Sequence, residues 1–309
     1  MILSILIPTF NRIDFLKKNI DELISFSENE VIDFEIIISD NNSSDGTRTY
    51  LNSIINERVK THIQKENIGA INNCFFLMER SKSKYIMFLG DDDYLDPSYL
   101  QKLLPLLKTE NYSCVFPSRL SLFRDGTLKP SMDNEKQPKE YRRGWFSALI
   151  NSQRATQLSG VVQLKEGLIE SYNENKVSNL YPFIYFTIFN CLRGKSYLLP
   201  NFPVKITQMV SGEENFDYEK LNLLDHVFDN FHKVNCLTPL KIFMFESYFL
   251  YKQPSRYLSI IRQKGFKGFL EFLKNFYSIK KLTFVTKFIF PIIFIVVFIK
   301  RGSLILFRR

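Results

Sequence analysis

The chain has 309 residues, and 45% of them are hydrophobic, which is sufficient for a packed core and about two domains. Its net charge is +9, but residues 251–309 hold 13 of the 41 lysines and arginines and a single acid, Glu271, so this segment carries +12 and the remainder −3. The composition excludes a disordered chain. Because the positive charge is concentrated in the tail, nucleic acid is not expected as a partner.

The first half of the chain alternates apolar runs with amphipathic segments. Met1–Pro8 lacks the basic stretch and the long apolar core of a signal peptide, so we expect a cytoplasmic chain. Strands buried on both faces are predicted at 2–7, 34–39, 59–63, 84–89 and 113–116. Helices are predicted around 16–24 and at 45–56, 70–80 and 97–107. This order predicts an α/β fold with a doubly wound, mainly parallel sheet, in which ligands bind beyond the carboxyl ends of the strands.

Three consecutive aspartates, Asp91, Asp92 and Asp93, directly follow the fourth predicted strand. Such a triplet carries self-repulsion and a desolvation cost, and its use is to hold a hard divalent cation whose other ligands are phosphates and water. The alternative is a loop that caps the next helix. Asp96 before Pro97 already supplies that cap, so the triplet indicates a nucleotide site with Mg²⁺ or Mn²⁺.

Polar residues also follow the first two predicted strands. Pro8, Thr9 and Asn11 come after the first strand, and Asp40 and Asn41 come after the second. Each group alone is compatible with turn chemistry, but their coincidence at one edge of the sheet predicts a shared site. The first turn contains no GxGxxG or GxxxxGK[ST] pattern, which argues against a dinucleotide dehydrogenase or a P-loop NTPase.

Four ordered stretches, 5–12, 37–46, 67–73 and 88–97, resemble those of family 2 glycosyltransferases with the GT-A fold. The resemblance covers about residues 1–120 well. It implies a GT-A, Rossmann-like domain over 1–215, in which 1–118 bind the nucleotide sugar and 119–215 form the acceptor side. The residues that it places at the nucleotide are Thr9, Asp40, Asn67, Gly69 and Asp91, and Pro8 and Asn11 join this nucleotide-binding set because they follow the first strand.

The D-x-D element of that family begins where this chain has Gly90. The resemblance therefore implies Asp92 as the metal ligand, with Asp91 near the ribose. Asp40 would accept hydrogen bonds from the base edge. Because the first carboxylate is missing, the cation would be held mostly by diphosphate and water.

An inverting transferase also needs a carboxylate base on the acceptor side. Ser159 and Gly160 resemble the turn that enters the acceptor site of the family. The familiar acidic pair is absent from 179–182, which leaves Glu170 and Glu174, four residues apart, or Asp93 as candidate bases. Glu170 and Glu174 are equally compatible with two solvated surface acids.

The resemblance implies a glycosyltransferase that moves a sugar from a nucleotide sugar, UDP-linked, to a lipid-linked saccharide in bacterial polysaccharide or lipopolysaccharide synthesis, with inversion and with a metal ion. The alternative is a catalytically weak nucleotide-sugar-binding protein of the same fold. The absent acidic pair and the lost first aspartate favour that alternative. A nucleotidyltransferase would require a Gly-rich, basic first loop, which 9–12 does not provide.

Residues 216–309 are predicted to form a helical region with a basic, amphipathic membrane anchor. Twelve apolar residues, Phe288–Ile299, would reach about 18 Å as a helix, short of a hydrocarbon core of about 30 Å. We therefore expect an interfacial or re-entrant anchor on the cytoplasmic face of the inner membrane, peripheral or monotopic. The alternatives are a buried core helix, the contact of a homo-oligomer, or a true membrane span.

The sequence contains three further features outside these motifs. The polar segment 119–143 is compatible with a flexible loop over a cleft or with a plain surface excursion. His226 and His232 are six residues apart, which does not place both on one helical face, so they do not predict a metal cluster. The cysteines at 74, 114, 191 and 236 have no CxxC or zinc spacing and are expected to be small buried side chains.

Overall fold

The computed structural model describes residues 1–28, 33–131, 135–208 and 223–302. The chain divides into two compact units. The first consists of 1–147, 157–170 and 190–215, and the second consists of 148–156, 171–189 and 216–309. The proposed domain boundary after residue 215 stays a prediction, and the second unit includes two earlier segments besides the C-terminal region.

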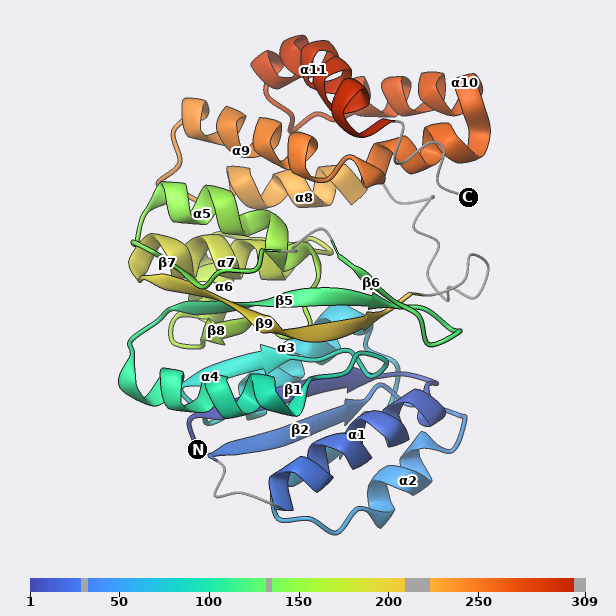
Figure 1. The fold of residues 1–309 in the computed structure, drawn as a ribbon, viewed down its shortest axis with the longest axis vertical. Coiled ribbons are helices and arrows are strands. Elements are labelled where there is room, and N and C mark those ends of the chain that lie inside the picture. The colour runs from blue at the N-terminus through green and yellow to red at the C-terminus, as the bar shows by residue number, and fades with distance from the viewer. Residues whose placement is uncertain (29–32, 132–134, 209–222, 303–309) are drawn as a thin grey trace. The chain divides into compact units, whose positions relative to one another are not determined.

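The first unit is built on one mixed sheet, for which the described residues supply nine strands in the order β3-β2-β1-β4-β8-β5-β9-β7, with β6 paired to β5 (Figure 1). The strands are β1 (Leu3–Thr9), β2 (Phe34–Asp40), β3 (Val59–Ile63), β4 (Tyr85–Phe88), β5 (Cys114–Leu122), β6 (Leu128–Pro130), β7 (Lys139–Tyr141), β8 (Val162–Leu164) and β9 (Ser196–Thr207). The first four strands are mutually parallel, with β1 between β2 and β4. The predicted α/β class is confirmed.

Helices cover both faces of these parallel strands because successive strand residues point to opposite sides. The helices concerned are α1 (Ile13–Glu28), α2 (Thr47–Ser53), α3 (Ala70–Arg80) and α4 (Pro97–Thr109). Alternate residues of β1, such as Ile5 and Ile7, share a buried cluster with Leu16 of α1 and Leu103 of α4. Helix α3 contacts β1 and β2. These layers fix the carboxyl ends of the strands at one edge.

Two sequence expectations need correction. The sheet is mixed beyond β4, because β8 inserts antiparallel between β4 and β5, although β5 and β9 are parallel. The segment 119–143 is also less irregular than expected where it is described. Strand β5 continues to Leu122 and forms a hairpin with β6, whose turn contains Gly126 at φ 81°, and β7 pairs with β9.

Three helices include residues of both units or link them along the chain: α5 (Trp145–Ser152), α6 (Leu168–Glu174) and α7 (Pro182–Arg193), together with the 3₁₀ turn Gln153–Thr156. The second unit continues with α8 (Leu223–His232), α9 (Pro239–Lys252), α10 (Ser255–Ser278), α11 (Phe284–Val297) and the π-helical turn Phe298–Gly302. The predicted helical character of the C-terminal region therefore agrees with the structure.

Aromatic side chains form the core of the second unit. Phe231 of α8 packs against Phe245 of α9, with ring centroids 5.3 Å apart. Phe276 of α10 lies against Phe290 of α11 at 4.1 Å between ring centroids. Among the residues that the structure describes, none of the helices combines the length and the apolar character needed to cross a bilayer.

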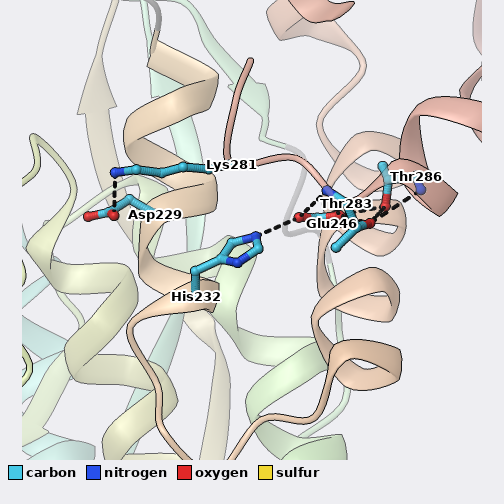
Figure 2. A network of polar contacts seen from close by, with 6 residues as sticks. All are labelled: Asp229, His232, Glu246, Lys281, Thr283 and Thr286. Atoms are coloured by element: carbon cyan, nitrogen blue, oxygen red, sulfur yellow. Dashed lines mark hydrogen bonds and ion pairs between the residues drawn. The ribbon is translucent and has the colours of Figure 1, made fainter.

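A buried polar network joins three parts of the second unit (Figure 2). Glu246 of α9 is fully buried, and its carboxylate accepts hydrogen bonds from the Thr283 backbone N–H at 3.2 Å and from the Thr286 hydroxyl at 2.5 Å. His232 of α8 lies 3.0 Å from the same carboxylate. A buried carboxylate thus stands at the N-terminus of α11, where the helix dipole favours a negative charge.

Candidate functional site

The ends of three parallel strands meet through direct hydrogen bonds. The Thr9 hydroxyl at the end of β1 donates to Asp91 Oδ2 at 2.7 Å, just beyond β4. The Asn41 backbone N–H beyond β2 donates to the Thr9 carbonyl at 2.9 Å. The polar groups that follow these strands in sequence therefore lie together at one edge of the sheet.

The loop after β1 is held against the loop after β2. Asn11 has φ 54°, a left-handed conformation that Asn adopts more readily than most residues. Its backbone N–H donates to the Ser43 hydroxyl at 2.8 Å, and its side-chain carbonyl accepts from the Ser44 backbone N–H at 2.8 Å. The Ser43 hydroxyl and N–H in turn donate to Asp40, which is fully buried. Asp40 therefore shapes the turn that borders the site.

Asn67 and Gly69 are joined to the same edge through Asn41. Asn41 is buried, and its side-chain amide donates to Asn67 Oδ1 at 2.8 Å. Its carbonyl oxygen accepts from the Ile68 backbone N–H at 2.9 Å. Asn67 Oδ1 also accepts from the Gly69 backbone N–H at 2.9 Å. Gly69 has φ 84°, which favours glycine, and it opens α3.

The three aspartates occupy different environments. Asp91 and Asp93 are buried, at 7% and 4% exposed. The side chain of Asp92 is 16% exposed and forms an ion pair with the Arg12 guanidinium, whose side chain is 24% exposed. Of the triplet, Asp92 is therefore the carboxylate most open to a ligand.

Burial dominates the electrostatics of the outer two carboxyls. Burial, followed by the charge of Asp92, raises the pKa of Asp91 to about 7. The same two causes raise the pKa of Asp93 to about 6, against hydrogen bonds from Ser159 and the Thr207 backbone that lower it. Both outer carboxyls are thus easier to protonate than an aspartate in water.

These residues fit a hard cation only as a site with few protein ligands. Within the described parts of the chain, no group of three or more His, Cys, Asp or Glu side chains is arranged to hold a metal ion. One carboxylate at Asp92 suits a cation that takes its other oxygens from a diphosphate and from water. A Cβ atom at Gly90 would lie 2.9 Å from Asp93 Oδ2, so an added carboxylate there would displace the present triplet.

Ser159 and Gly160 are bound to the triplet. The Ser159 hydroxyl donates to Asp93 Oδ2 at 2.5 Å and accepts from the Gly90 backbone N–H at 2.9 Å. Gly160 has φ 80°, and a Cβ atom there would lie 2.5 Å from Val204 Cγ2. This turn therefore adjoins the acidic edge, and its contact with an acceptor stays a prediction.

The three candidate bases differ in accessibility. Both Asp93 carboxylate oxygens accept hydrogen bonds, from Ser159 and from the Thr207 backbone N–H at 2.9 Å. This geometry suits a residue that positions the loop better than one that removes a proton. Glu170 and Glu174 are exposed on α6, which follows β8. Because β8 runs antiparallel to β4 and Leu164 pairs with Tyr85, α6 begins at the edge of the sheet where β4 starts, opposite the triplet. The side chains that donate to the triplet's carboxylates belong instead to Thr9, Arg12 and Ser159.

Sequence reasoning missed three residues that organise the site. Arg12 lies within one of the recognised stretches but received no role, although a guanidinium close to an acidic triplet is a natural partner. Asn19 is a buried polar residue in the apolar stripe of α1, and its side-chain amide donates to the Gly90 and Asp93 carbonyls at 2.9 and 2.8 Å. Thr207 of β9 donates its hydroxyl to the Asp92 carbonyl.

The environments of His232 and of the cysteines can also be compared with the sequence expectations. His232 lies 3.0 Å from the Glu246 carboxylate in the second unit. Three of the free cysteines are buried, but Cys236 is exposed, so the expectation of burial is wrong for that residue.

Two curated bacterial relatives share part of this chain. A glucosyltransferase from Campylobacter jejuni, named GalNAc(5)-diNAcBac-PP-undecaprenol beta-1,3-glucosyltransferase, is 30% identical over 155 residues, which cover 47% of this chain and 48% of that protein. The chondroitin synthase of Pasteurella multocida is 27% identical over 129 residues, covering 41% of this chain and 13% of that protein. The chain thus spans less than half the length of each.

Solved structures share the fold over a larger part of the chain. Residues 1–349 of TarS from S. aureus, in complex with UDP-GlcNAc, superpose with a TM-score of 0.65 at 15% identity, covering 89% of this chain and 81% of that one. At this identity the likeness concerns the fold alone. Residues 4–162, just over half of the sequence, match the family described as glycosyl transferase family 2. With that match lying over the parallel strands and the polar edge described above, the chain belongs to glycosyl transferase family 2.

Proposed function

We propose that this protein transfers a sugar from a UDP-linked donor to a lipid-linked saccharide during synthesis of a bacterial cell-surface polysaccharide. The observation that carries the proposal is the hydrogen-bonded edge formed by three strand ends, with Arg12 and Asp92 as its accessible charged pair. UDP-GlcNAc is bound by the S. aureus protein of the same fold. The name of the C. jejuni relative includes an undecaprenyl diphosphate carrier. These two names support the donor and acceptor classes.

The proposed chemistry is displacement of the donor diphosphate by an acceptor hydroxyl, with inversion at the anomeric carbon. Family 2 glycosyltransferases commonly use a divalent metal. Mg²⁺ or Mn²⁺, when bound, would supply charge neutralisation to the departing diphosphate. Asp92 would hold that ion, and Arg12 would bind a diphosphate oxygen. Thr9 and Asn19 hold the flanking carboxylate and carbonyl groups in place.

The proposed mechanism also needs a carboxylate that accepts the proton of the acceptor hydroxyl. Glu170 and Glu174 are accessible, whereas Asp93 is buried and accepts two hydrogen bonds. We propose that Asp93 positions the triplet against the Ser159 turn. Glu170 and Glu174 stay predictions as the proton acceptor, because α6 follows β8 at the edge of the sheet where β4 begins. Separate Glu170→Gln and Glu174→Gln variants test these assignments.

A second candidate function is binding of a nucleotide sugar without efficient transfer. Two observations favour it: Gly90 stands at the first acid position, and 179–182 contains no acid. The two functions are separated by incubating the full chain with UDP-glucose, UDP-GlcNAc and UDP-GalNAc, with Mn²⁺ or with EDTA. Release of UDP that requires Mn²⁺ supports the transferase. Calorimetric binding of UDP with no UDP release from any donor, even with a lipid-linked acceptor extract, supports the binding protein.

Replacing Arg12 by alanine is expected to weaken UDP binding by about tenfold or more, because a charge-assisted hydrogen bond to the diphosphate is lost. Arg12→Lys should retain part of the affinity, because it keeps the charge but not the planar geometry. Isothermal titration calorimetry with UDP measures both without turnover. Arg80→Ala is the matched control, because Arg80 ends α3 and packs over Phe76. Equal UDP affinities of Arg12→Ala and the unsubstituted protein would contradict the assignment.

Asp40→Ala is expected to raise the dissociation constant for UDP by about tenfold while changing the rate of the chemical step less. The Asp40 carboxylate accepts hydrogen bonds from Ser43, and the Ser43 hydroxyl accepts one from the Asn11 backbone. Loss of the carboxylate therefore frees the loop that borders the proposed nucleotide site. Titration with UDP and single-turnover kinetics separate the two effects. Unchanged UDP affinity in a folded variant would require the nucleotide to lie elsewhere.

A further inference from the structure

Helix α11 has one packed face and one exposed apolar face. Thr286, Phe290 and Val297 are buried within the second unit. The opposite side exposes five large apolar residues, each between 56% and 80% exposed: Phe284, Phe288, Ile292, Ile295 and, in the π-helical turn, Ile299. We call these five residues the outer face of α11.

The spacing of the outer face makes it continuous. At roughly 100° per residue, the four members within α11 lie inside an arc of about 80° on the helix surface. The buried residues lie on the other side. A continuous exposed stripe of this kind marks an interaction surface, whereas single exposed apolar residues are ordinary.

The orientation of the outer face is fixed by the packed side. The Glu246 carboxylate accepts from Thr283 and Thr286 at the start of α11, and Phe290 packs on Phe276. Figure 2 shows how Glu246 lies beneath the first turn of the helix. The apolar stripe is therefore presented by a helix anchored within its own unit.

The positive charge of the C-terminal helices selects the partner of the outer face. Lys280 and Lys300 are exposed near the two ends of α11, and Lys267 and Lys274 are exposed on α10. The segment 251–309 carries a formal +12 in sequence. A second copy of this chain would bring two such charges together, whereas the anionic lipids of a bilayer attract each lysine.

The length of α11 determines how it meets a bilayer. Its 14 residues extend about 21 Å, short of the hydrocarbon core of about 30 Å. We propose that the outer face of α11 inserts into the interfacial layer of an anionic phospholipid membrane, with the helix axis parallel to the membrane plane. This inference rests on the proposed function: insertion of the outer face would bring the enzyme to the membrane surface that holds a lipid-linked acceptor.

Flotation of the full chain with vesicles tests this inference. Vesicles of phosphatidylcholine with phosphatidylglycerol are compared with vesicles of phosphatidylcholine alone, at low and at high salt. The protein is expected to float with anionic vesicles and to stay largely bound at high salt, because insertion of apolar side chains is not screened by ions. A combined Phe288→Gln, Ile292→Gln and Ile295→Gln variant should lose at least about tenfold in vesicle partition.

Matched controls separate insertion of the outer face from nonspecific binding through any exposed apolar residue. Leu240 of α9, 67% exposed, and Ile55 of the first unit, 99% exposed, are apolar residues outside the outer face. Leu240→Gln and Ile55→Gln should float as the unsubstituted protein does. Removing charge with Lys274→Gln, Lys280→Gln and Lys300→Gln should weaken binding at low salt, with a smaller change at high salt.

Three results would overturn the inference. One is a full chain that stays in the supernatant with anionic vesicles at low salt. Another is a triple glutamine variant that floats unchanged. The third is a dimer, measured by light scattering, which the triple variant converts to a monomer while vesicles bind neither. Metal-dependent UDP release in solution is measured on the same samples, so vesicle binding without UDP release contradicts only the proposed function, and UDP release without vesicle binding contradicts only this inference.

Discussion

Asp92→Asn is expected to lower sugar transfer by about a hundredfold or more, because the variant loses the accessible carboxylate of the triplet. Stabilisation of a leaving group by a bound cation contributes several kcal/mol, and about 1.4 kcal/mol corresponds to a factor of ten in rate. The change in side-chain volume is small, and the ion pair with Arg12 is partly exposed, so folding stability should change by about 1 kcal/mol or less. Release of UDP as a function of Mn²⁺ concentration measures the effect.

The matched control for this variant is Asp96→Asn. Asp96 lies four residues further on and caps α4 by accepting from the Ser98 backbone N–H at 2.9 Å. Asparagine caps helices about as well as aspartate does, so transfer by this control should be nearly unchanged. Near-normal turnover of Asp92→Asn at saturating Mn²⁺, with an intact melting profile, would exclude Asp92 as the metal ligand.

The parallel part of the sheet could be predicted because its signal is local. Runs such as 2–7 and 34–39 are predominantly apolar on both faces, with Ser4 and Glu35 as their interior polar residues, and each is followed by an amphipathic segment. The order of the remaining strands could not be predicted. Strand β8 has only three residues, and it is held between β4 and β5 by pairings that join residues far apart in sequence. No local pattern specifies such a partner.

The site could likewise be predicted in part: its residues at the strand ends were found, but the contacts that orient them were not. Residues at the strand ends, including Thr9, Asp40 and the triplet, were found because parallel strands place their carboxyl ends together. The contacts that orient them come from elsewhere. Thr207 donates its backbone N–H to Asp93 across 114 positions of sequence, and this depends on the bulged pairing of β5 with β9. Arg12 and Asn19 lie close to the motif, but their contacts with the triplet depend on how the loop after β4 turns.

For the C-terminal helices, the helical character could be predicted from the sequence, but the packing could not. The C-terminal region was predicted to be helical, with Phe288–Ile299 as an apolar run, and α11 contains this run apart from its last two residues, which continue as a π-helical turn. Which face of α11 packs could not be read from a run that is apolar all round. The structure resolves this through Phe290, which meets Phe276, and through Thr286, which meets Glu246. A buried glutamate in the middle of α9 has no recognisable sequence signal.

Glu246→Gln is expected to release the start of α11, with a loss of about 2–3 kcal/mol in the free energy of opening that helix. The carboxylate is fully buried and accepts from the Thr283 N–H, the Thr283 hydroxyl at 2.6 Å and the Thr286 hydroxyl at 2.5 Å, beside His232. Hydrogen bonds to a charged group contribute about 1.5–3 kcal/mol, and a buried amide satisfies these donors less well. The negative charge also stands at the positive end of the α11 dipole.

Hydrogen exchange measured by mass spectrometry on peptides from 284–297 provides the readout, because global unfolding of a chain with two units need not be a single transition. A loss of about 2 kcal/mol corresponds to roughly thirtyfold faster exchange. Glu271→Gln is the matched control: Glu271 is exposed on α10 and meets Lys264 at 3.6 Å, an ion pair whose removal costs about 0.5 kcal/mol or less. Equal exchange rates in the two variants would mean that aromatic packing between Phe276 and Phe290, and not the carboxylate, holds α11 in place. Faster exchange confined to Glu246→Gln would identify the buried carboxylate as the group that fixes the orientation of the outer face.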